Sequence, residues 1–274
     1  MVKKLAERGY IFLILAIMYA PIVMVIVFSF SNTTNFTFPN GFTLEAYKSL
    51  FTSAPAKLWD SLKNTVVIAV VSSVASTLIG SIAAVGIFNL KPRERKVVEN
   101  INQLPIINSE IVMAVSLMLF FSTFAFPQGY VRLIIGHISF CTPYVVLSVM
   151  PRLMQMDPNI YEAALDLGAS PIKALFKVIL PIIFPGIVSG FAMAFTISLD
   201  DFIITQLNKG ASTGIDTLST YLYSSLRNAS GLRPLWLPVF SIIIVVVVAA
   251  VLIINLRSYK KVGTEKEKKN EKNR

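Results

Sequence analysis

Cysteine and histidine are almost missing from this chain of 274 residues, which contains only Cys141 and His137. A single cysteine excludes a disulfide within the chain, and its position in an apolar run is typical of a small core residue. The imidazole has no second histidine or thiolate at ligand spacing. We therefore expect no metal site and assign His137 a structural, hydrogen-bonded role.

Charged residues are also scarce. They make up 15% of the sequence, against about a quarter in soluble proteins, while 54% of residues are hydrophobic and the mean hydropathy is +0.67. This composition excludes a water-covered globular surface. The net charge of +10 would favour a nucleic-acid partner if it covered a soluble face. Here the basic residues flank apolar blocks, so we expect membrane lipid and no nucleic acid as the partner.

Motifs for catalysis are absent as well. The sequence contains no G-x-x-x-x-G-K-[ST] pattern, so this chain does not bind ATP through a P-loop. It also has no nucleophile–base pair and no cluster of metal ligands. We predict no catalytic residue, and any catalysis must belong to a partner.

Six long apolar blocks dominate what is present. The first has 21 residues, and as an α-helix it would extend about 31 Å, enough to cross a hydrocarbon core. Because backbone polar groups cannot stay unpaired in lipid, each block is predicted to be a helix. The prediction is an all-α polytopic membrane protein with six transmembrane helices. The blocks are Tyr10–Phe30, Thr65–Leu90, Ile106–Ala125, Val131–Met150, Ile182–Ile204 and Leu235–Leu256.

The distribution of lysine and arginine predicts the orientation. With the N-terminus inside, 18 of the 25 basic residues lie on cytoplasmic segments; without the C-terminal tail the split is 10 against 7. The positive-inside rule thus places both termini in the cytoplasm. The domain boundaries that follow are a cytoplasmic N-terminus at 1–9, a transmembrane domain at 10–256 and a basic cytoplasmic tail at 257–274.

Small residues recur one helical turn apart in two of the blocks. Gly186, Gly190 and Ala194 follow this spacing, as do Gly80 and Ala84. Such spacing lets helix backbones approach closely in lipid. It therefore predicts helix packing rather than ligand binding.

The loop at 157–181 is the most informative cytoplasmic segment. Asp157 with Pro158, and Ser170 with Pro171, are typical helix starts, while Gly168 is suited to end a helix in the left-handed conformation. Two short helices are predicted, the second over Pro171–Leu180. The first bears Ala163 and Ala164 on one face and an apolar pair on another, Tyr161 and Leu165, a pattern that favours docking into a partner's groove. The alternative is an amphipathic connector on the membrane surface.

This loop resembles the EAA loop of bacterial ABC importer permeases. The residues that carry the resemblance are Glu162-Ala163-Ala164, Gly168, and Val178-Ile179-Leu180-Pro181, with valine in place of the usual isoleucine at 178. In that family the loop forms the coupling helix that contacts the ATP-hydrolysing subunit. The resemblance thus implies contact with an ATPase. The implied contact residues are Tyr161, Glu162, Ala163, Ala164, Leu165, Gly168 and Pro181.

The resemblance extends over nearly the whole chain. Tyr19-Ala20-Pro21-Ile22, Glu110-Ile111-Val112 and Ser198-Leu199-Asp200-Asp201-Phe202 are similar to the C-type permeases of the spermidine/putrescine group. This implies a subunit in the bacterial inner membrane that works with a second homologous permease, an ABC ATPase dimer and an extracytoplasmic substrate-binding protein. ATP and Mg²⁺ would be bound by the ATPase, with no cofactor in this chain.

Three acidic residues fall within or beside predicted spans. Asp200 and Asp201 end the fifth block towards the outside, and Glu110 lies near the inner end of the third. An acid at the bilayer centre costs roughly 3 kcal/mol, so a functional role is its default interpretation. We assign all three to a cationic substrate's pathway. The alternatives are helix capping or solvation for the aspartates, and a salt bridge to Arg93 or Arg95 for Glu110.

Two other functions are considered. One is an ABC permease for ferric iron or an aminophosphonate, although an anion carrier should have basic residues where the two aspartates stand. The other is a secondary transporter driven by an ion gradient, which predicts broken helices in matching halves and no coupling loop.

Overall fold

The computed structural model describes residues 2–31, 41–157, 159–211, 213–228 and 235–246. Within these ranges every regular element is a helix, which confirms the all-α prediction. The chain divides into two compact units, one formed by 56–224 and the other by 1–55 together with 225–274. Each unit is described by itself.

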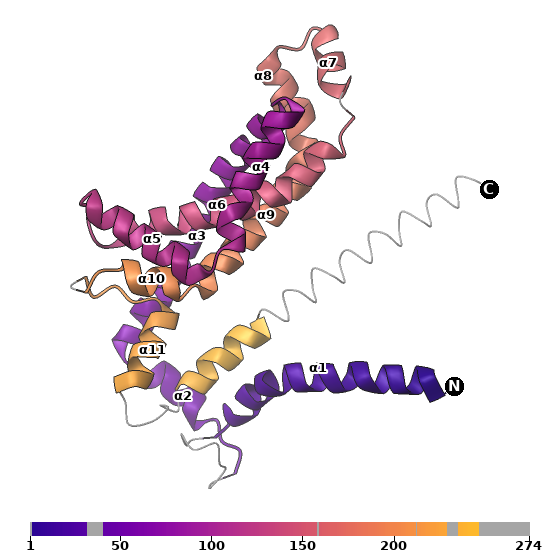
Figure 1. The fold of residues 1–274 in the computed structure, drawn as a ribbon. Coiled ribbons are helices and arrows are strands. Elements are labelled where there is room, and N and C mark those ends of the chain that lie inside the picture. The colour runs from indigo at the N-terminus through magenta and orange to yellow at the C-terminus, as the bar shows by residue number, and fades with distance from the viewer. Residues whose placement is uncertain (1, 32–40, 158, 212, 229–234, 247–274) are drawn as a thin grey trace. The chain divides into compact units, whose positions relative to one another are not determined.

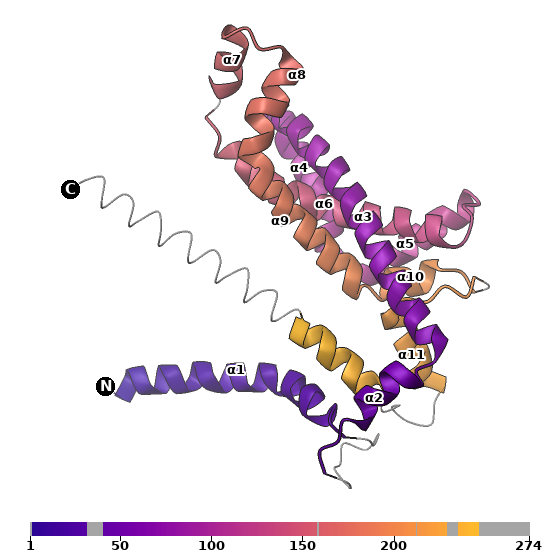
Figure 2. The same cartoon turned by 180° about the vertical axis from the view of Figure 1, so that it is seen from behind.

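Three long helices form the body of the larger unit. They are α3 (Ala56–Phe88), α6 (Tyr130–Met154) and α9 (Leu180–Asp200), and each packs against the other two. Both views show them side by side (Figures 1 and 2). All three belong to helices that are long and apolar enough to cross a membrane.

Glycines allow these helices to approach each other closely. A Cβ atom on Gly80 of α3 would lie 2.7 Å from Val145 Cβ of α6, and one on Gly190 of α9 would lie 3.3 Å from Val145 Cα. Gly186 meets the same helix at the backbone of Ser148 and Val149. The predicted packing role of the small residues is confirmed, because only hydrogen fits at these contacts.

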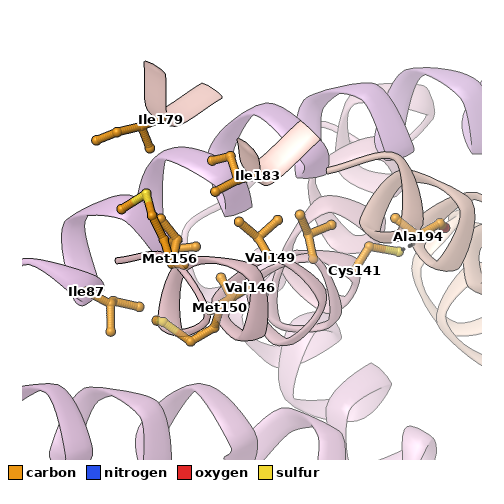
Figure 3. Close-up of a cluster of buried hydrophobic side chains, with 12 residues drawn as sticks. Ile87, Cys141, Val146, Val149, Met150, Met156, Ile179, Ile183 and Ala194 are labelled. Atoms are coloured by element: carbon orange, nitrogen blue, oxygen red, sulfur yellow. Dashed lines mark hydrogen bonds between the residues drawn. The ribbon is translucent and has the colours of Figure 1, made fainter. Parts of the chain in front are cut away.

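A continuous apolar core lies between the three helices (Figure 3). Val145 and Val149 of α6 are fully buried, and they pack with Ala84 of α3 and with Ile183 and Ala194 of α9. Cys141 belongs to this core and is 0% exposed, as predicted for a small core residue.

The second and fifth predicted spans have different bounds in the structure. Helix α3 begins nine residues before the predicted Thr65. The expected short helix Pro171–Leu180 is not separate, since α8 (Pro171–Ala174), the π-helix η1 (Leu175–Ile179) and α9 form one candidate span, Pro171–Asp200. That span ends at Asp200 rather than at Ile204, because Asp201 leaves the helical conformation with a ψ of 132°.

The third predicted span is broken. Helix α4 (Pro92–Ile107) and helix α5 (Glu110–Thr123) meet at an angle of 101°, so the straight helix predicted over Ile106–Ala125 is wrong. Asn108 and Ser109 interrupt the helix with extended ψ angles of 150° and 143°. The 14 residues of α5 extend only about 21 Å, less than a hydrocarbon core.

The smaller unit holds α1 (Val2–Phe28), α2 (Glu45–Thr52) and an apolar helix, Trp236–Val246. Tyr47 of α2 links them: its hydroxyl lies 2.7 Å from Ser29 Oγ and donates to Ser241 Oγ at 3.2 Å. The apolar window of α1 is 0% buried. Lipid or another chain must therefore cover that surface.

The described residues contain four spans and the bent pair. The helix at Trp236–Val246 begins where the sixth span, Leu235–Leu256, is predicted, and the rest of that span and the tail 257–274 lie outside the described residues. At the other end, α1 is helical from Val2, so no break in structure marks the predicted boundary between residues 9 and 10.

Candidate functional site

Helix α7 (Asn159–Asp166) and α8, the first turn of the Pro171–Asp200 span, lie at one end of the larger unit (Figures 1 and 2). The backbone N–H of Asn159 donates to Asp157 Oδ1 at 2.9 Å, so Asp157 caps the start of α7 as predicted. Ser170 caps α8, accepting from the N–H of Lys173 at 3.4 Å. These side chains satisfy donors that a helix start leaves unpaired.

Gly168 ends α7 in the predicted left-handed conformation, with a φ of +84°. Its N–H donates to Leu165 O at 2.8 Å, and the next N–H, of Ala169, donates to Ala164 O at 3.1 Å. A Cβ at Gly168 would meet nothing within 4 Å. The glycine is therefore required by backbone conformation and not by lack of space.

The two faces of α7 differ from the expected arrangement. Tyr161 and Leu165 are half-buried, and Tyr161 packs against the apolar core of its own chain. Glu162 and Ala163 of α7 are exposed, and so is Leu167, which follows the helix and is 89% exposed. Sequence periodicity found the apolar pair correctly but could not decide whether it faces the partner or its own chain.

A cavity of about 460 Å³ lies beneath the loop. Its walls come from the ends of α3 and α6 as well as from the loop, and they include Phe88, Leu153, Tyr161 and Glu162. The loop therefore borders this cavity while Tyr161 packs against the core.

A π-helical turn joins the loop to the fifth span. Pro181 has no N–H to donate to the carbonyl of Lys177, which lies within the π-helical turn η1 (Leu175–Ile179). A proline removes one hydrogen bond from a helix, and the wider π-helical turn occurs where this bond is missing. Pro181 itself is exposed.

A second group of candidate residues lies at the opposite end of the unit. Asp201 stands between α9 and α10 (Ile203–Asn208) and is 5% exposed. Its carboxylate accepts from the N–H groups of Ile204 at 3.2 Å and Thr205 at 2.9 Å, and from Thr205 Oγ1 at 2.7 Å. This is the geometry of a helix cap, which the sequence offered as the alternative.

His137 of α6 completes the surroundings of Asp201. Its Nε2 lies 3.4 Å from Asp201 Oδ2 and 3.1 Å from Thr205 Oγ1, and its Nδ1 lies 2.7 Å from Ser198 Oγ. The imidazole is 1% exposed, and both ring nitrogens have partners. The hydrogen-bonded structural role predicted for His137 is confirmed.

Asp200 and Glu110 lie beside this buried group. Asp200 is exposed and is the last residue of α9, while Glu110 is half-buried and is the first residue of α5. Helix α5 packs against α10, and the Glu110 carboxyl lies within electrostatic range of Asp201 and Asp200. The three carboxyl groups therefore lie where α9 ends and where α5 and α10 begin.

This placement corrects the position predicted for Glu110. A straight third span would put it near the inner end, far from the aspartates. Instead α4 runs from the α7 and α8 end back towards α10 (Figures 1 and 2), and the bend before Glu110 brings it to Asp200 and Asp201. Among the described residues, no ion pair joins Glu110 to Arg93 or Arg95.

A comparison of the sequence with known families identifies the kind of protein to which this loop and helix bundle belong. The family described as the binding-protein-dependent transport system inner membrane component matches residues 76–259. The chain belongs to this family of transport permeases. It is thus a multi-pass component of the inner membrane, and the matched range includes the whole loop and the acidic cluster.

Relatives of this permease are named as polyamine permeases. It is 34% identical over 221 residues to the spermidine/putrescine transport system permease protein PotC of Escherichia coli K12, covering 81% of this chain and 83% of the relative. It is 30% identical to the PotC homolog of Mycoplasma genitalium, covering 94% and 92%. The putrescine transport system permease protein PotI of Escherichia coli K12 is 31% identical over 217 residues, covering 77% and 76%.

The fold of the permease is that of a solved ABC importer. A crystal structure of a bacterial ABC transporter that imports alginate superposes with a TM-score of 0.70 and 17% identity, covering 92% of this chain and 95% of the other. At this identity the likeness shows the shared fold alone.

The sequence missed some residues that build the acidic site of the permease. Ser198 and Thr205 contact His137 from two elements; Ser198 begins the motif Ser198–Phe202, but the motif did not indicate this contact, and Thr205 belongs to no recognisable motif. A helical projection would have shown Ser198 on the same buried face of α9 as Ala194. Nothing in the sequence indicated that Ser198 contacts His137, because the two residues are far apart along the chain.

Proposed function

We propose that this permease is the transmembrane subunit of an ATP-driven importer for polyamines such as spermidine or putrescine. The observation that carries the proposal is the similarity to named polyamine permeases over at least three quarters of both chains. The convergence of Glu110, Asp200 and Asp201 supports it chemically. Carboxylates replace part of the hydration of a moving ammonium group.

The three acids have different parts in this proposal. Asp200 is exposed and sits at the carboxyl end of α9, where the helix dipole adds partial negative charge, and Glu110 lies beside it. These two would contact the substrate. Asp201 is buried and bonded to the first turn of α10 and to His137. It would therefore hold α10 in place and add negative potential at the site without touching the substrate.

Coupling to ATP is assigned to the loop. The exposed residues Glu162, Ala163 and Leu167 would fit a cleft on one subunit of an ATPase dimer, and Gly168 would fix the turn beside them. A second homologous permease would share the translocation path, and an extracytoplasmic binding protein would deliver the substrate. The ATPase would bind ATP and Mg²⁺, and both termini of this chain would lie in the cytoplasm.

The decisive experiment is uptake by the importer reconstituted in liposomes with its co-purifying subunits and labelled putrescine or spermidine. We expect ATP-dependent uptake that Asp200→Asn lowers about tenfold, since a charge-assisted contact contributes about 1.5–3 kcal/mol. The matched control is Asp60→Asn, which changes an exposed acid outside the cluster. Normal uptake by Asp200→Asn would remove this residue from the pathway.

Asp201→Asn gives a different signature. An amide nitrogen in place of Oδ2 cannot accept the two hydrogen bonds that this oxygen receives from Thr205, so this variant should lose thermal stability as well as transport. A double substitution at 200 and 201 would mix the two effects.

Ion-gradient coupling is the competing mechanism. A secondary transporter predicts broken helices in both halves of the fold, whereas the described residues contain a single bent pair. Uptake that persists without ATP and stops when the ion gradient is collapsed would overturn the importer proposal. ATP-dependent uptake of ferric iron or an aminophosphonate, without competition by polyamines, would overturn the substrate.

A further inference from the structure

A groove of about 350 Å³ lies between α4 and α6, away from the acidic cluster. Its polar wall is formed by Glu99, Asn102, Gln103 and Gln155, and its apolar wall is formed by five residues of α6. Two of these, Val146 and Met150, belong to the packed core (Figure 3). The volume lies within the range of about 300–1,000 Å³ typical of small-molecule sites.

Glu99 is the unusual residue in this groove. Its Oε1 atom is buried and has no hydrogen-bond partner in the described part of the chain. An acceptor left in this state costs about 1–3 kcal/mol, more when it is charged. A hydrogen-bond donor to Glu99 Oε1 is therefore missing from the described part of the groove.

The neighbouring basic residues of α4 do not supply that donor. Arg95 lies one turn before Glu99, but its guanidinium is placed over the ring of Phe88, 5.6 Å from the centroid. The ion pairs of the described residues do not include Glu99, and none of the residues lining the groove is basic.

The other polar groups of the groove also favour a donor. Asn102 gives its Nδ2 to the carbonyl of Pro143 at 3.3 Å, which leaves its own carbonyl oxygen to accept. Gln103 and Gln155 add two side-chain amides to the same groove, each with an acceptor oxygen and an NH2 group. One carboxylate with several amide oxygens, next to methionine and valine, matches a compact alkylammonium group: the head needs acceptors, and the methylene chain needs apolar contact.

We propose that the groove between α4 and α6 is a second binding station for the substrate, in which Glu99 receives an ammonium group of a polyamine after it leaves the acidic cluster. The inference rests on the proposed function for its ligand. It extends that function because Glu99 lies on α4, the helix whose far end leads to Glu110. A polyamine moving along α4 would thus pass from one carboxylate site to another.

The test compares two isosteric variants of α4 in the reconstituted importer. Glu99→Gln removes the charge in the groove, whereas Glu94→Gln removes a charge from an exposed residue of α4 that does not line it. We expect Glu99→Gln to change KM or the maximal rate of polyamine uptake about tenfold, and Glu94→Gln to leave both within twofold. Equal kinetics in the two variants would overturn the inference while leaving wild-type import, and thus the proposed function, intact.

A binding measurement independent of transport uses Gln103→Cys. Cys141 is 0% exposed, so this permease chain should give no labelling in the wild-type importer, as measured on the separated subunit. The new thiol should react faster with a cationic than with an anionic thiol reagent of equal size, and putrescine should slow the reaction at least threefold. If the thiol shows no preference for the cationic reagent and no protection by putrescine, the groove does not bind the substrate and the inference is overturned.

One outcome identifies a different role for the groove. If Glu99→Gln weakens co-purification of the second permease and leaves uptake per assembled complex unchanged, Glu99 belongs to a subunit interface and the station is excluded. If wild-type importer takes up no polyamine at all, the proposed function fails first, and protection of the thiol by putrescine is not expected.

Discussion

At the scale of single residues, Gly168 shows most clearly how one position controls function. Backbone conformation alone requires glycine at this position, with a φ of +84° and open space around the missing Cβ. Its neighbours Glu162, Ala163 and Leu167 are displayed outward only if the turn has this shape. A change here should therefore alter docking without unfolding the bundle.

We expect Gly168→Val to insert normally in the membrane but to reduce co-purification of the ATPase subunit about tenfold or more and to abolish uptake. A β-branched residue in the left-handed region costs of order 1–3 kcal/mol, enough to shift the turn. Gly168→Asn is the matched control, because asparagine adopts this conformation more readily. Unchanged ATPase binding by the valine variant would contradict the docking role of α7.

At the scale of elements, helix packing depends on which glycines face a neighbour. Gly80 and Gly86 lie on the same helix, α3, but a Cβ on Gly80 would lie 2.7 Å from Val145 Cβ, while one on Gly86 would meet nothing within 4 Å. The two positions form a natural pair for the same substitution.

Gly80→Ala should destabilise the folded permease by about 1–3 kcal/mol through overpacking, whereas Gly86→Ala should leave its stability nearly unchanged. Thermal unfolding in detergent measures both. Adding Val145→Ala should restore part of the loss in the Gly80 variant, since it removes the atoms that the new methyl group meets. Equal stability of the two alanine variants would show that α3 and α6 do not pack as described.

The carboxylate of Asp216 stabilises the loop between α10 and α11 (Leu218–Asn228) through two ion pairs. Lys209 Nζ lies 2.5 Å and Lys57 Nζ 3.3 Å from it, and the backbone carbonyl of Asp216 accepts from Asn64 at 3.0 Å. Burial acts to raise the pKa of Asp216, but the hydrogen bond and charge of Lys209, followed by those of Lys57, hold the pKa below its ordinary value of 3.8.

This lowered pKa predicts how stability depends on pH. The carboxylate is favoured by the folded state, so its contribution is fully present above about pH 4 and is lost as the pH falls through the folded-state pKa. Asp216→Asn should lower stability by about 1 kcal/mol at pH 7 and should remove that part of the acid-induced loss. Thermal unfolding of both proteins between pH 7 and pH 3 is the measurement, and parallel curves would contradict the role of this ion pair.

The break between α4 and α5 is the element that the sequence did not reveal. The apolar run through Ile106 and Ile107 continues after Glu110, so hydropathy indicates a single span, and Asn108 with Ser109 is too short a polar interruption to predict a bend of 101°. The direction of α5 is decided by its packing against α6 and α10. Such contacts have no signal in local composition.

At the scale of the whole molecule, the orientation across the membrane can be tested directly. A reporter active only outside the cytoplasm should work when fused after Gly214, in the loop that follows α10, and should fail after Arg95 or Lys173. This pattern follows from the positive-inside rule and from the positions of α8 and α10 at opposite ends of the larger unit (Figures 1 and 2). Activity at Lys173 would place the α7 loop outside, where no ATPase could reach it.

The sequence by itself determined the all-α membrane class, the caps and the first helix of the 157–181 loop, and the family. These properties depend on hydropathy, on cap residues and on motif spacing, all of which act within a few turns of chain. It also identified Glu110, Asp200 and Asp201 as candidate functional residues, because placing an acid within a membrane span costs free energy.

Only the tertiary structure decided which of these residues meet and which way they face. It placed Tyr161 on its own core, joined Glu110 to the two aspartates through a bent helix, and separated exposed Asp200 from buried Asp201. Each of these depends on contacts between residues distant in sequence. Local propensity has no information about such contacts, because the same side chain fits a partner's groove, a neighbouring helix or a lipid surface equally well.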